Sequence, residues 1–439
     1  MLLTDSVARH FLFLQGPGGR FFAQLSRRLE TATSTTSRIN VCPGDFFMWR
    51  RRGNSTNYRG RYEDWQKYLQ AYVVANGVTD IVLFSDSRPY HRVAKIVAEQ
   101  HDINLFVFEN GYLRPDWITL ELGGVNGNSA FPRTRAKVEQ LPAPPAPDYL
   151  ELKKPTKFQS YWPDVKFHFG NTFFAPLFPF YRRHRTALPL AELIGHGLKW
   201  LSWPIKHFRS NMTLDRLWRM PRPYYLFALQ LEHDYQLIEH SPFESMRQAT
   251  DRVIESFAAN APEESMLLVK NHPLDNNLVS RRREIMRLAK MHGVAERVIY
   301  VDMGPNPQIL EKASGMVTVN STLGTSALFH GVPVCAMGRA VYDVEGLTHQ
   351  LGLDAFWQNP TKPDGALFSH FRRALIANCQ IRGRFVTAQG RNLAARACAE
   401  RMIATPYIAS IRTRVKVAGS TELQPRDDLS NSDNPPRLD

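Results

Sequence analysis

Two short apolar runs in the C-terminal half of the chain, residues 266–269 and 316–319, end at polar residues whose side chains can hold a phosphate. An apolar run of this length, bounded by polar residues, is typical of a strand buried in a parallel sheet. Ligands of such sheets bind beyond the carboxyl ends of the strands. We therefore predict a nucleotide-phosphate site formed by Lys270, His272 and Pro273 after the first run and by Asn320, Ser321, Thr322 and Gly324 after the second.

The residue types at these two strand ends suit a phosphate leaving group. The charge of Lys270 or the imidazole of His272 can stabilise a departing phosphate, and Pro273 fixes the turn that follows. The hydroxyls at 321 and 322 precede a helix predicted from about Ser326, whose free N–H groups attract anions. Either motif alone is weak evidence, because Ser-Thr often only caps a helix. Two motifs in one half of the chain are more specific.

The N-terminal half offers acids and arginines at two further strand ends. Asp86, Arg88 and His91 follow a run at 80–84, and Glu109 and Arg114 follow a run at 104–108. A carboxylate at such an edge can act as a general base or a nucleophile. An arginine there can bind a substrate carboxylate or phosphate with two hydrogen bonds. Two structural alternatives stay open: a local ion pair between Asp86 and Arg88, and a helix-capping Glu109 partnered by Arg114.

Two more groups of residues are candidates for substrate contact. The glycines Gly18 and Gly19 follow the first predicted strand and let the backbone approach a ligand closely. Gln230, Asp234 and Gln236 follow a strand predicted at 224–229 and can read a base or sugar hydroxyls. The same three side chains equally suit a role in tying the two halves of the chain together.

The elements that must position these residues alternate as strand and helix, which predicts an α/β fold with two Rossmann-like domains facing a cleft. We assign residues 1–150 to a first α/β domain with the catalytic carboxylate and 221–405 to a second, nucleotide-binding one. Residues 151–220 form a basic, aromatic insert, and 406–439 a disordered tail. Residues 188–208 suit an amphipathic helix that Pro204 kinks or ends. Such an insert fits an anionic membrane surface, or a helical hairpin packed between the domains.

Composition excludes some classes and leaves others open. A chain of 439 residues with 43% hydrophobic residues favours two globular domains, and no run is long enough to predict a transmembrane helix. The net charge of +14 favours nucleic acid, anionic lipid or phosphorylated ligands without choosing among them. The four cysteines lack metal-ligand spacing and indicate reduced thiols of a cytosolic protein. We predict no metal site and no secretory signal.

Six motifs, in this order, resemble the capsule polysaccharide Kdo-transferase family of Gram-negative bacteria, the KpsS/KpsC type. The motifs are QGPGGRFF, DSRPYH, ENGYLRP, the LQ…SPF stretch, VKNHPLD and VNSTLGTSALFHGVPV. The resemblance covers about residues 8–400 and is specific in combination, although each motif alone is not. The single-module layout and ENGYLRPDWITLE are more similar to the KpsS branch than to the tandem-module KpsC branch.

The resemblance implies a GT-B-like glycosyltransferase that transfers β-Kdo, with retention, from CMP-Kdo to a lipid of the phosphatidylglycerol type. That step would start the linker of a capsular polysaccharide, at the cytoplasmic face of the inner membrane and beside other capsule assembly proteins. His272-Pro273 and Ser321-Thr322 match motifs that related transferases use on the CMP phosphate. Glu109 falls where the family carries an acidic pair, but Asn110 replaces the second acid, so Glu109 acts alone or Asp86 shares the role.

The resemblance implies a nucleotide-sugar donor and an anionic lipid as partners, with no cofactor and no nucleic acid. Two rival functions remain open at this stage. One is another nucleotide-sugar enzyme of the same build, such as a sialyltransferase-like transferase or a 2-epimerase. The other is a non-catalytic membrane adaptor of capsule export, which would keep the basic aromatic insert while its cleft residues were dispensable.

Overall fold

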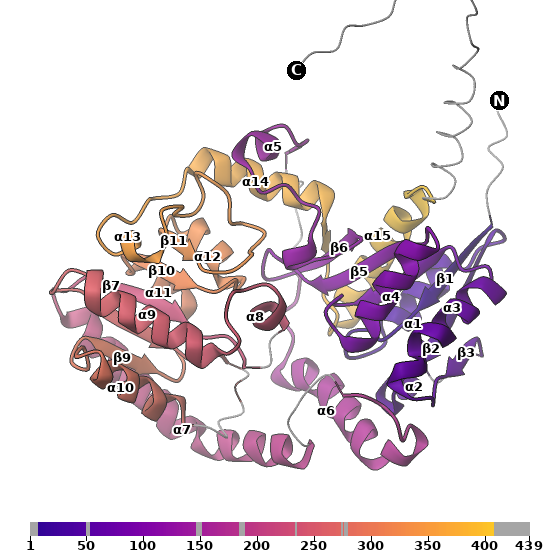
Figure 1. The fold of residues 1–439 in the computed structure, drawn as a ribbon, viewed down its shortest axis with the longest axis horizontal. Coiled ribbons are helices and arrows are strands. Elements are labelled where there is room, and N and C mark those ends of the chain that lie inside the picture. The colour runs from indigo at the N-terminus through magenta and orange to yellow at the C-terminus, as the bar shows by residue number, and fades with distance from the viewer. Residues whose placement is uncertain are drawn as a thin grey trace, which may run out of the picture.

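The chain folds into two α/β lobes joined by long helices (Figure 1). The computed structural model describes residues 8–49, 53–145, 152–183, 189–232, 235–273, 275 and 280–407. The predicted tail therefore lies almost entirely outside the described residues. Each lobe is built on its own sheet, and we call them the first and second lobe in chain order.

The first lobe contains a seven-stranded sheet in the order β12-β6-β5-β4-β1-β2-β3. Five of these strands run parallel, whereas β6 is antiparallel to both β5 and β12. The strands are β1 (Arg9–Phe13), β2 (Ser34–Asn40), β3 (Ser55–Asn57), β4 (Asp80–Phe84), β5 (Asn104–Asn110), β6 (Trp117–Leu122) and β12 (Gln380–Arg382). The helices are α1 (Phe21–Leu29), α2 (Pro43–Trp49), α3 (Trp65–Ala75), α4 (Pro89–Gln100) and α15 (Ala388–Ala404), with short 3-10 turns η1 (Tyr62–Asp64) and η2 (Asn126–Asn128). The short helix α5 (Arg135–Glu139) packs instead on α14 (Gly365–Asn378) of the second lobe (Figure 1).

Both faces of this sheet are covered, which explains why its central strands are apolar throughout. Along β1, Phe11 and Phe13 pack on the face covered by α1, α2 and α15, whereas Leu12 packs on the face covered by α3 and α4. When the side chains on both faces of a strand are buried in a core, neither face needs polar residues. The 80–84 and 104–108 runs read as buried strands for this reason.

The second lobe contains five parallel strands in the order β11-β10-β7-β8-β9. The strands are β7 (Tyr224–Ala228), β8 (Met266–Lys270), β9 (Val298–Val301), β10 (Gly315–Thr318) and β11 (Val334–Ala336). The helices are α8 (Tyr235–Glu239), α9 (Met246–Asn260), α10 (Arg281–Met291), α11 (Asn306–Glu311), α12 (Leu323–Phe329), α13 (Leu353–Phe356) and α14 (Gly365–Asn378). One core cluster of this lobe also takes in Tyr112, Phe131 and Val138 of the first half, so apolar packing continues from one lobe into the other.

The fold class is confirmed, and the topology departs from the sequence prediction at three places. The region after Pro115 forms β6, which makes the first sheet mixed instead of parallel. Residues 45–57, whose polar, arginine-rich sequence predicts a loop, hold most of α2 and the edge strand β3. Residues 380–404, assigned to the second domain, return to the first sheet as β12 and α15. Short polar strands such as β3 and β12 carry no periodic apolar signal, which is why the pattern missed them.

The insert consists of two helices, α6 (Lys157–Phe173) and α7 (Pro189–Arg219), with the 3-10 turn η3 (Ala175–Leu177) between them. The helix α7 continues through Pro204, so the proline does not end the helix. It packs on the second lobe through β9, and α6 packs on α2 of the first lobe, where Asn171 accepts a hydrogen bond from the Gly44 amide at 2.8 Å. Figure 1 shows both helices along one side of the molecule, spanning the two lobes.

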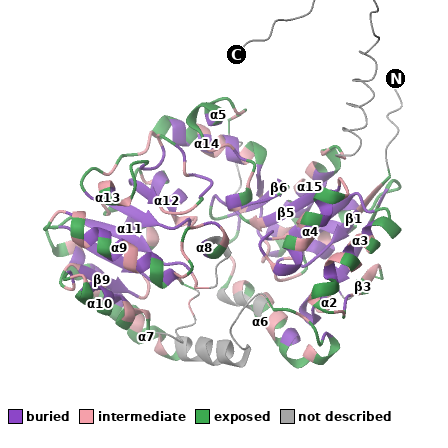
Figure 2. Cartoon of the chain, in the orientation of Figure 1, coloured by how far each residue is buried: buried purple, intermediate pink, exposed green. Residues whose placement is uncertain are grey.

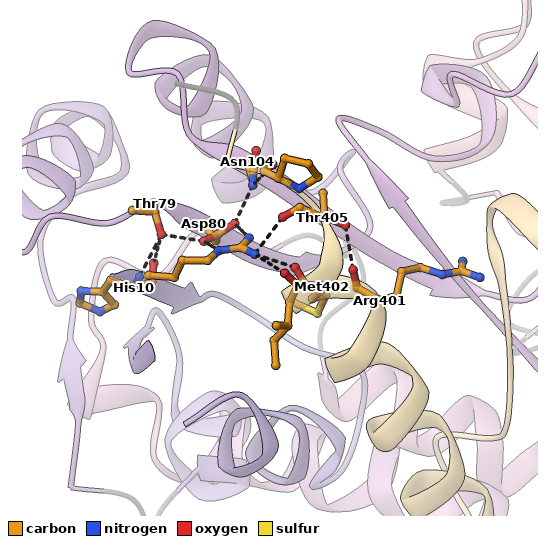
Figure 3. Close-up of polar contacts among 10 residues, drawn as sticks. His10, Thr79, Asp80, Asn104, Arg401, Met402 and Thr405 are labelled. Atoms are coloured by element: carbon orange, nitrogen blue, oxygen red, sulfur yellow. Dashed lines mark hydrogen bonds and ion pairs between the residues drawn. The ribbon is translucent and has the colours of Figure 1, made fainter. Parts of the chain in front are cut away.

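The returning helix α15 is attached to the first sheet by Arg9 at the start of β1. Figure 3 shows its partners Asp80, Met402 and Thr405 close together. The guanidinium donates to the carbonyl oxygens of Met402 and Thr405 at 2.8 and 2.9 Å, and its Nε donates to Asp80 Oδ2 at 2.9 Å. Asp80 is fully buried and also accepts from Asn104 at 2.9 Å. One arginine thus neutralises a buried carboxylate and satisfies the last carbonyls of the helix.

We predict that Arg9→Met lowers the free energy of unfolding by about 3 kcal/mol, because it leaves the Asp80 carboxylate buried without its counter-charge. Urea denaturation followed by circular dichroism measures this. The double variant Arg9→Met/Asp80→Asn should recover part of the loss. Arg396→Met, which removes an exposed arginine paired with Glu400 on the same α15, should stay within about 0.5 kcal/mol of the unsubstituted protein. An Arg9 effect no larger than this control would contradict the assignment.

Candidate functional site

Lys270, at the carboxyl end of β8, is a buried cation with no partner among the described residues. Its side chain is only 4% exposed, and its ammonium makes no hydrogen bond or ion pair with the described part of the chain. Burial lowers the pKa of Lys270 to about 8. Burying a charge without a partner costs free energy. An anion that bound beside Lys270 would be attracted strongly, because no described residue neutralises the ammonium.

The residues after Lys270 form a turn that is held by Asn271. The Asn271 side chain accepts a hydrogen bond from the His272 amide at 2.9 Å and donates to Asp275 at 3.0 Å. His272 is half-buried and Pro273 is exposed, whereas Lys270 and Asn271 lie beneath them. This turn therefore presents the imidazole at the surface of the sheet edge and keeps the ammonium below it.

The second predicted group follows β10 and is joined to Gln230, which follows β7. Gln230 donates to Asn320 Oδ1 at 2.9 Å, and the Asn320 amide donates back to Gln230 Oε1 at 3.0 Å. Because β7 lies between β10 and β8, Gln230 stands between the 320–324 and 270–273 groups. Strands two positions apart lie about 10 Å from each other. Both predicted phosphate groups thus share one edge of the sheet, with Gln230 between them.

Ser321 and Gly324 are set by a buried tyrosine. Tyr342 donates to the Ser321 carbonyl oxygen at 2.6 Å, and a Cβ placed on Gly324 would lie 2.3 Å from the Tyr342 hydroxyl. Only glycine allows this approach at 324. The helix α12 begins at Leu323, three residues before the predicted start, and the Ser321 hydroxyl accepts from the Leu323 amide at 3.2 Å. Ser321 and Thr322 are both half-buried at this turn.

Asp86 is placed behind the contact between the lobes. It is 2% exposed, and its Oδ2 accepts hydrogen bonds from Asn128 Nδ2 at 2.9 Å and from the Val125 amide at 3.3 Å. These bonds hold the turn η2 in place. The η2 turn also contacts the second lobe. A Cβ placed on Gly127 would lie only 2.3 Å from the ring of His240. In this conformation Asp86 orders the lobe junction and does not reach solvent.

Glu109 is the more accessible of the two candidate acids. The strand β5 continues through Asn110, so Glu109 lies inside the strand, opposite Thr119 of β6. It therefore caps no helix. The side chain is half-buried, and its Oε1 accepts from the Asn110 amide at 2.8 Å and from Asn110 Nδ2 at 3.2 Å. The asparagine that replaces the expected second acid is thus a hydrogen-bond donor to the first.

Arg88 and His91 are turned inward beside the glycine turn. Arg88 donates to Gln15 Oε1 at 2.9 Å and lies over the Phe84 ring, so the local ion pair with Asp86 is not formed. His91 is fully buried, and its Nδ1 lies 2.7 Å from the Ser85 carbonyl oxygen. Burial, followed by the charge of Arg88, lowers the pKa of His91 to about 3. The imidazole is neutral, and contact with a substrate requires its turn to open.

The remaining predicted substrate contacts are distributed more loosely. Arg114 is exposed, and Gly18 and Gly19 are half-buried, with Gly19 in the left-handed region at φ +109°. A Cβ on Gly19 would meet Pro163 of α6 at 3.9 Å, which places this turn next to the insert. Asp234 lies outside the described residues. Gln236 belongs to α8, but its side chain also lies outside the description.

The sequence analysis missed His240, which connects the two lobes. Its ring packs on Gly127 of the first lobe, and its carbonyl oxygen accepts from the Arg339 amide at 2.7 Å and from Asn320 Nδ2 at 3.3 Å. An ion pair between Arg92 and Glu239 at 2.9 Å crosses the junction beside it. The available signal was position, since His240 immediately precedes the SPF residues of a recognised motif.

The analysis also missed a buried carboxylate, Glu121 of β6. Tyr112 donates to its Oε1 at 2.7 Å, Ser129 donates to its Oε2, and the Tyr112 hydroxyl accepts from the Asn126 amide at 2.5 Å. Burial raises the pKa of Glu121 to about 7. This chain links the first sheet to the η2 turn. Its members are spread over three elements, so spacing alone gave no sign of it.

No three His, Cys, Asp or Glu side chains of the described residues come together where they can hold a metal ion. None of the described helices combines the length and the apolar character that crossing a bilayer requires.

The chain matches, over residues 79–386, the family described as "Capsule polysaccharide biosynthesis protein". It belongs to this family. The capsule polysaccharide export protein KpsS of Escherichia coli is 35% identical over 376 residues, which cover 85% of this chain and 96% of that relative. The capsule polysaccharide modification protein LipB of Neisseria meningitidis is 35% identical over 394 residues, covering 86% and 92%. The family predicted from the motifs is thereby confirmed.

Solved structures with a similar architecture include the β-Kdo 2,7 transferase region of KpsC from Thermosulfurimonas dismutans. It is 13% identical, with a TM-score of 0.41, over 90% of this chain and 98% of that one. A UDP-N-acetylglucosamine 2-epimerase from Neisseria meningitidis, bound to UDP-GlcNAc, is 10% identical with a TM-score of 0.32, over 90% and 100%.

We predict that cytidine monophosphate binds about tenfold more weakly at pH 9.5 than at pH 7.5. Lys270 is protonated below its pKa of about 8 and attracts the phosphate there, and the attraction is lost as the pH rises through that value. Isothermal titration calorimetry measures the dissociation constant. Lys270→Met should bind weakly at both pH values. A pH slope that persists in Lys270→Met would assign the effect to another group.

Proposed function

We propose that the protein is a retaining glycosyltransferase of capsule polysaccharide biosynthesis. It transfers β-Kdo from CMP-Kdo to a lipid acceptor of the phosphatidylglycerol type and so starts the poly-Kdo linker. The observation that carries this proposal is the buried Lys270, which has no partner among the described residues and lies on the same sheet edge as Asn320–Thr322. Family membership and the HP and Ser-Thr motifs support it.

In this proposal the second lobe binds the CMP phosphate. Lys270 supplies the charge from beneath the edge, and His272 donates from the exposed turn above it. Ser321 and Thr322 contribute hydroxyls from the neighbouring turn. These groups stabilise the negative charge that develops as the bond between phosphate and sugar breaks, which is where electrostatic catalysis acts most strongly.

The first lobe supplies the carboxylate. We assign this role to Glu109 because it is half-buried at the sheet edge, whereas Asp86 Oδ2 is engaged by Asn128 and the Val125 amide at the η2 turn. Retention follows from two displacements. The Glu109 carboxylate attacks the anomeric carbon as CMP departs, and an acceptor hydroxyl then attacks that carbon, releases the carboxylate and loses its proton. The two hydrogen bonds from Asn110 keep the carboxylate in position.

A lipid acceptor is supported by the exposed apolar side chains of the insert. Figure 2 shows exposed positions on both helices, at the side of the molecule that links the lobes. The large apolar residues exposed there include Trp162, Phe169, Phe173, Leu201, Ile205 and Phe208, with Ile205 71% exposed. Basic residues accompany them, such as Lys166 over the Trp162 ring. Aromatic and basic residues together favour an anionic bilayer surface.

The exposed apolar and basic surface of the insert also supports a second candidate function. A membrane adaptor without catalytic activity would use the insert and leave the sheet edge unused. The two proposals differ in what the His272 side chain does, because only the enzyme needs it.

We predict that His272→Ala reduces CMP release from CMP-Kdo at least about 100-fold while the melting temperature stays unchanged, because a half-buried turn residue contributes little to the core. Purified protein is given CMP-Kdo and a short-chain phosphatidylglycerol, and mass spectrometry identifies the lipid product. His292→Ala, another half-buried histidine of the second lobe, is the matched control. Unreduced turnover in His272→Ala would favour the adaptor and contradict the transferase.

We predict that the protein co-sediments with phosphatidylglycerol vesicles at low salt and that Phe169→Ser/Phe173→Ser/Phe208→Ser weakens the association about tenfold or more. The control Val74→Ser/Met291→Ser removes equally exposed apolar side chains elsewhere, since both are 67% exposed. It should bind as the unsubstituted protein does. Absence of vesicle binding at low salt would remove the membrane part of the proposal.

A further inference from the structure

A small pocket lies at the junction of the two lobes, next to the predicted phosphate edge. Its wall combines residues of both lobes, chiefly Tyr112 and Asn126 from the first and Asn320, Thr322, Thr325 and Arg339 from the second. The pocket shares Asn320 and Thr322 with the phosphate edge. The other four residues have no role in the function proposed above.

Two arginines approach this junction from opposite lobes without a carboxylate partner. Arg339 follows β11 and is exposed, and its side chain makes no hydrogen bond or ion pair with the described part of the chain. Arg133, from the first lobe, donates at 2.9 Å to the carbonyl oxygens of Asn126 and Gly127. Burial, followed by the charge of Arg339, lowers the pKa of Arg133, so the two cations lie close enough to repel each other.

The nearest carboxylates do not neutralise this pair. Glu121 is already engaged by Tyr112 and Ser129, and Asp343 accepts from Thr348 at 2.6 Å. Neither acid comes within ion-pairing distance of Arg133 or Arg339 among the pairs formed by described residues. The junction therefore carries two positive charges that an anion would bring together.

Buried hydrogen-bonding groups in the same wall also lack partners. The Thr325 residue is 5% exposed, and its buried hydroxyl makes no hydrogen bond with a described residue. The Nδ2 atom of Asn126 is also buried and makes no hydrogen bond within the described ranges. Buried donors are seldom left unsatisfied unless a ligand or water completes them. Both groups can donate to an acceptor oxygen in the pocket, so hydrogen bonding and charge indicate the same kind of ligand.

We infer that Arg339 and Arg133 form an anion site that bridges the lobes, and that its ligand is the carboxylate of the sugar donor. This inference rests on the proposed function. Kdo carries its carboxylate on the anomeric carbon, so a group that holds the carboxylate also orients the carbon under attack. A planar guanidinium binds a carboxylate with two parallel hydrogen bonds, and Thr325 and Asn126 complete the remaining lone pairs. The positive charge for the phosphate comes from a different residue, Lys270, on the other side of Gln230.

The site requires both lobes, which gives it a second consequence. One arginine comes from each lobe, so donor binding would join them across the junction that His240 already spans. CMP alone lacks the carboxylate and would bind only to the second lobe. The two ligands therefore separate the proposed carboxylate site from the phosphate site.

The test measures the dissociation constant for CMP and the KM for CMP-Kdo in the variant Arg339→Gln. We expect the KM for CMP-Kdo to rise about tenfold or more while the dissociation constant for CMP, measured by calorimetry, stays within about twofold. Arg339→Lys keeps the charge but cannot form two parallel hydrogen bonds to a carboxylate. Its KM for CMP-Kdo should therefore lie between those of the unsubstituted protein and Arg339→Gln. Arg133→Gln should show the same selectivity for CMP-Kdo. Arg396→Gln removes one charge from an exposed site on α15 and controls for net charge.

Each outcome decides a separate question. If the unsubstituted protein uses CMP-Kdo and Arg339→Gln matches it, the carboxylate site is wrong and the transferase proposal stands. If Arg339→Gln weakens CMP and CMP-Kdo equally, the arginine holds the phosphate and the inference is overturned. If the unsubstituted protein neither binds CMP nor uses CMP-Kdo, the proposed function fails and this inference fails with it. Because the Arg339 side chain is exposed and makes no hydrogen bond or ion pair with a described residue, its variants should melt at the unsubstituted temperature, which a thermal scan verifies.

Discussion

The packing of His240 against Gly127 is the contact on which the arrangement of the two lobes depends. A side chain at 127 would overlap the ring, so a glycine there is what allows the second lobe to approach. Behind the contact, Asp86 fixes the η2 turn, and ahead of it the His240 carbonyl oxygen is bonded by Asn320 and Arg339. A continuous chain of hydrogen bonds and packing therefore runs from a carboxylate in the first lobe to the predicted phosphate edge of the second.

Two buried or half-buried cations, one at the predicted phosphate edge and one at the lobe junction, lack an anionic partner among the described residues. Lys270 has no partner among the described residues, and Arg133 is bonded only to carbonyl oxygens. Leaving cations unpaired lowers stability, and sites that bind charged ligands often accept that cost. A doubly anionic sugar nucleotide, with one phosphate and one carboxylate, has the charge pattern that these groups can satisfy.

The C-terminal segment connects the lobes a second time. After α14 the chain crosses back to add β12 to the first sheet, and α15 packs against α1. Arg9 attaches the end of this helix to the start of β1 (Figure 3). Two crossings, one through the insert and one through this return, restrict how the lobes can rotate relative to each other. The insert thereby has two roles, a structural connection on its packed side and an exposed apolar surface on the other.

The sequence alone determined the elements that carry the site. Apolar runs bounded by polar residues located β4, β5, β8 and β10, and the six motifs identified the family, because strand burial and local turn chemistry are written in neighbouring residues. It also placed Lys270, Asn320 and Gln230 at strand ends that the fold brings to one edge.

Only the tertiary structure decided how those residues are used. Asp86 and Arg88 looked like equivalent polar residues, yet one holds the lobe junction and the other turns toward Gln15. The pairing of Gln230 with Asn320, the position of His240 and the approach of Arg133 to Arg339 join residues 80 to 206 positions apart in the chain. Such contacts depend on strand order and lobe packing, which a pattern of neighbouring residues cannot encode.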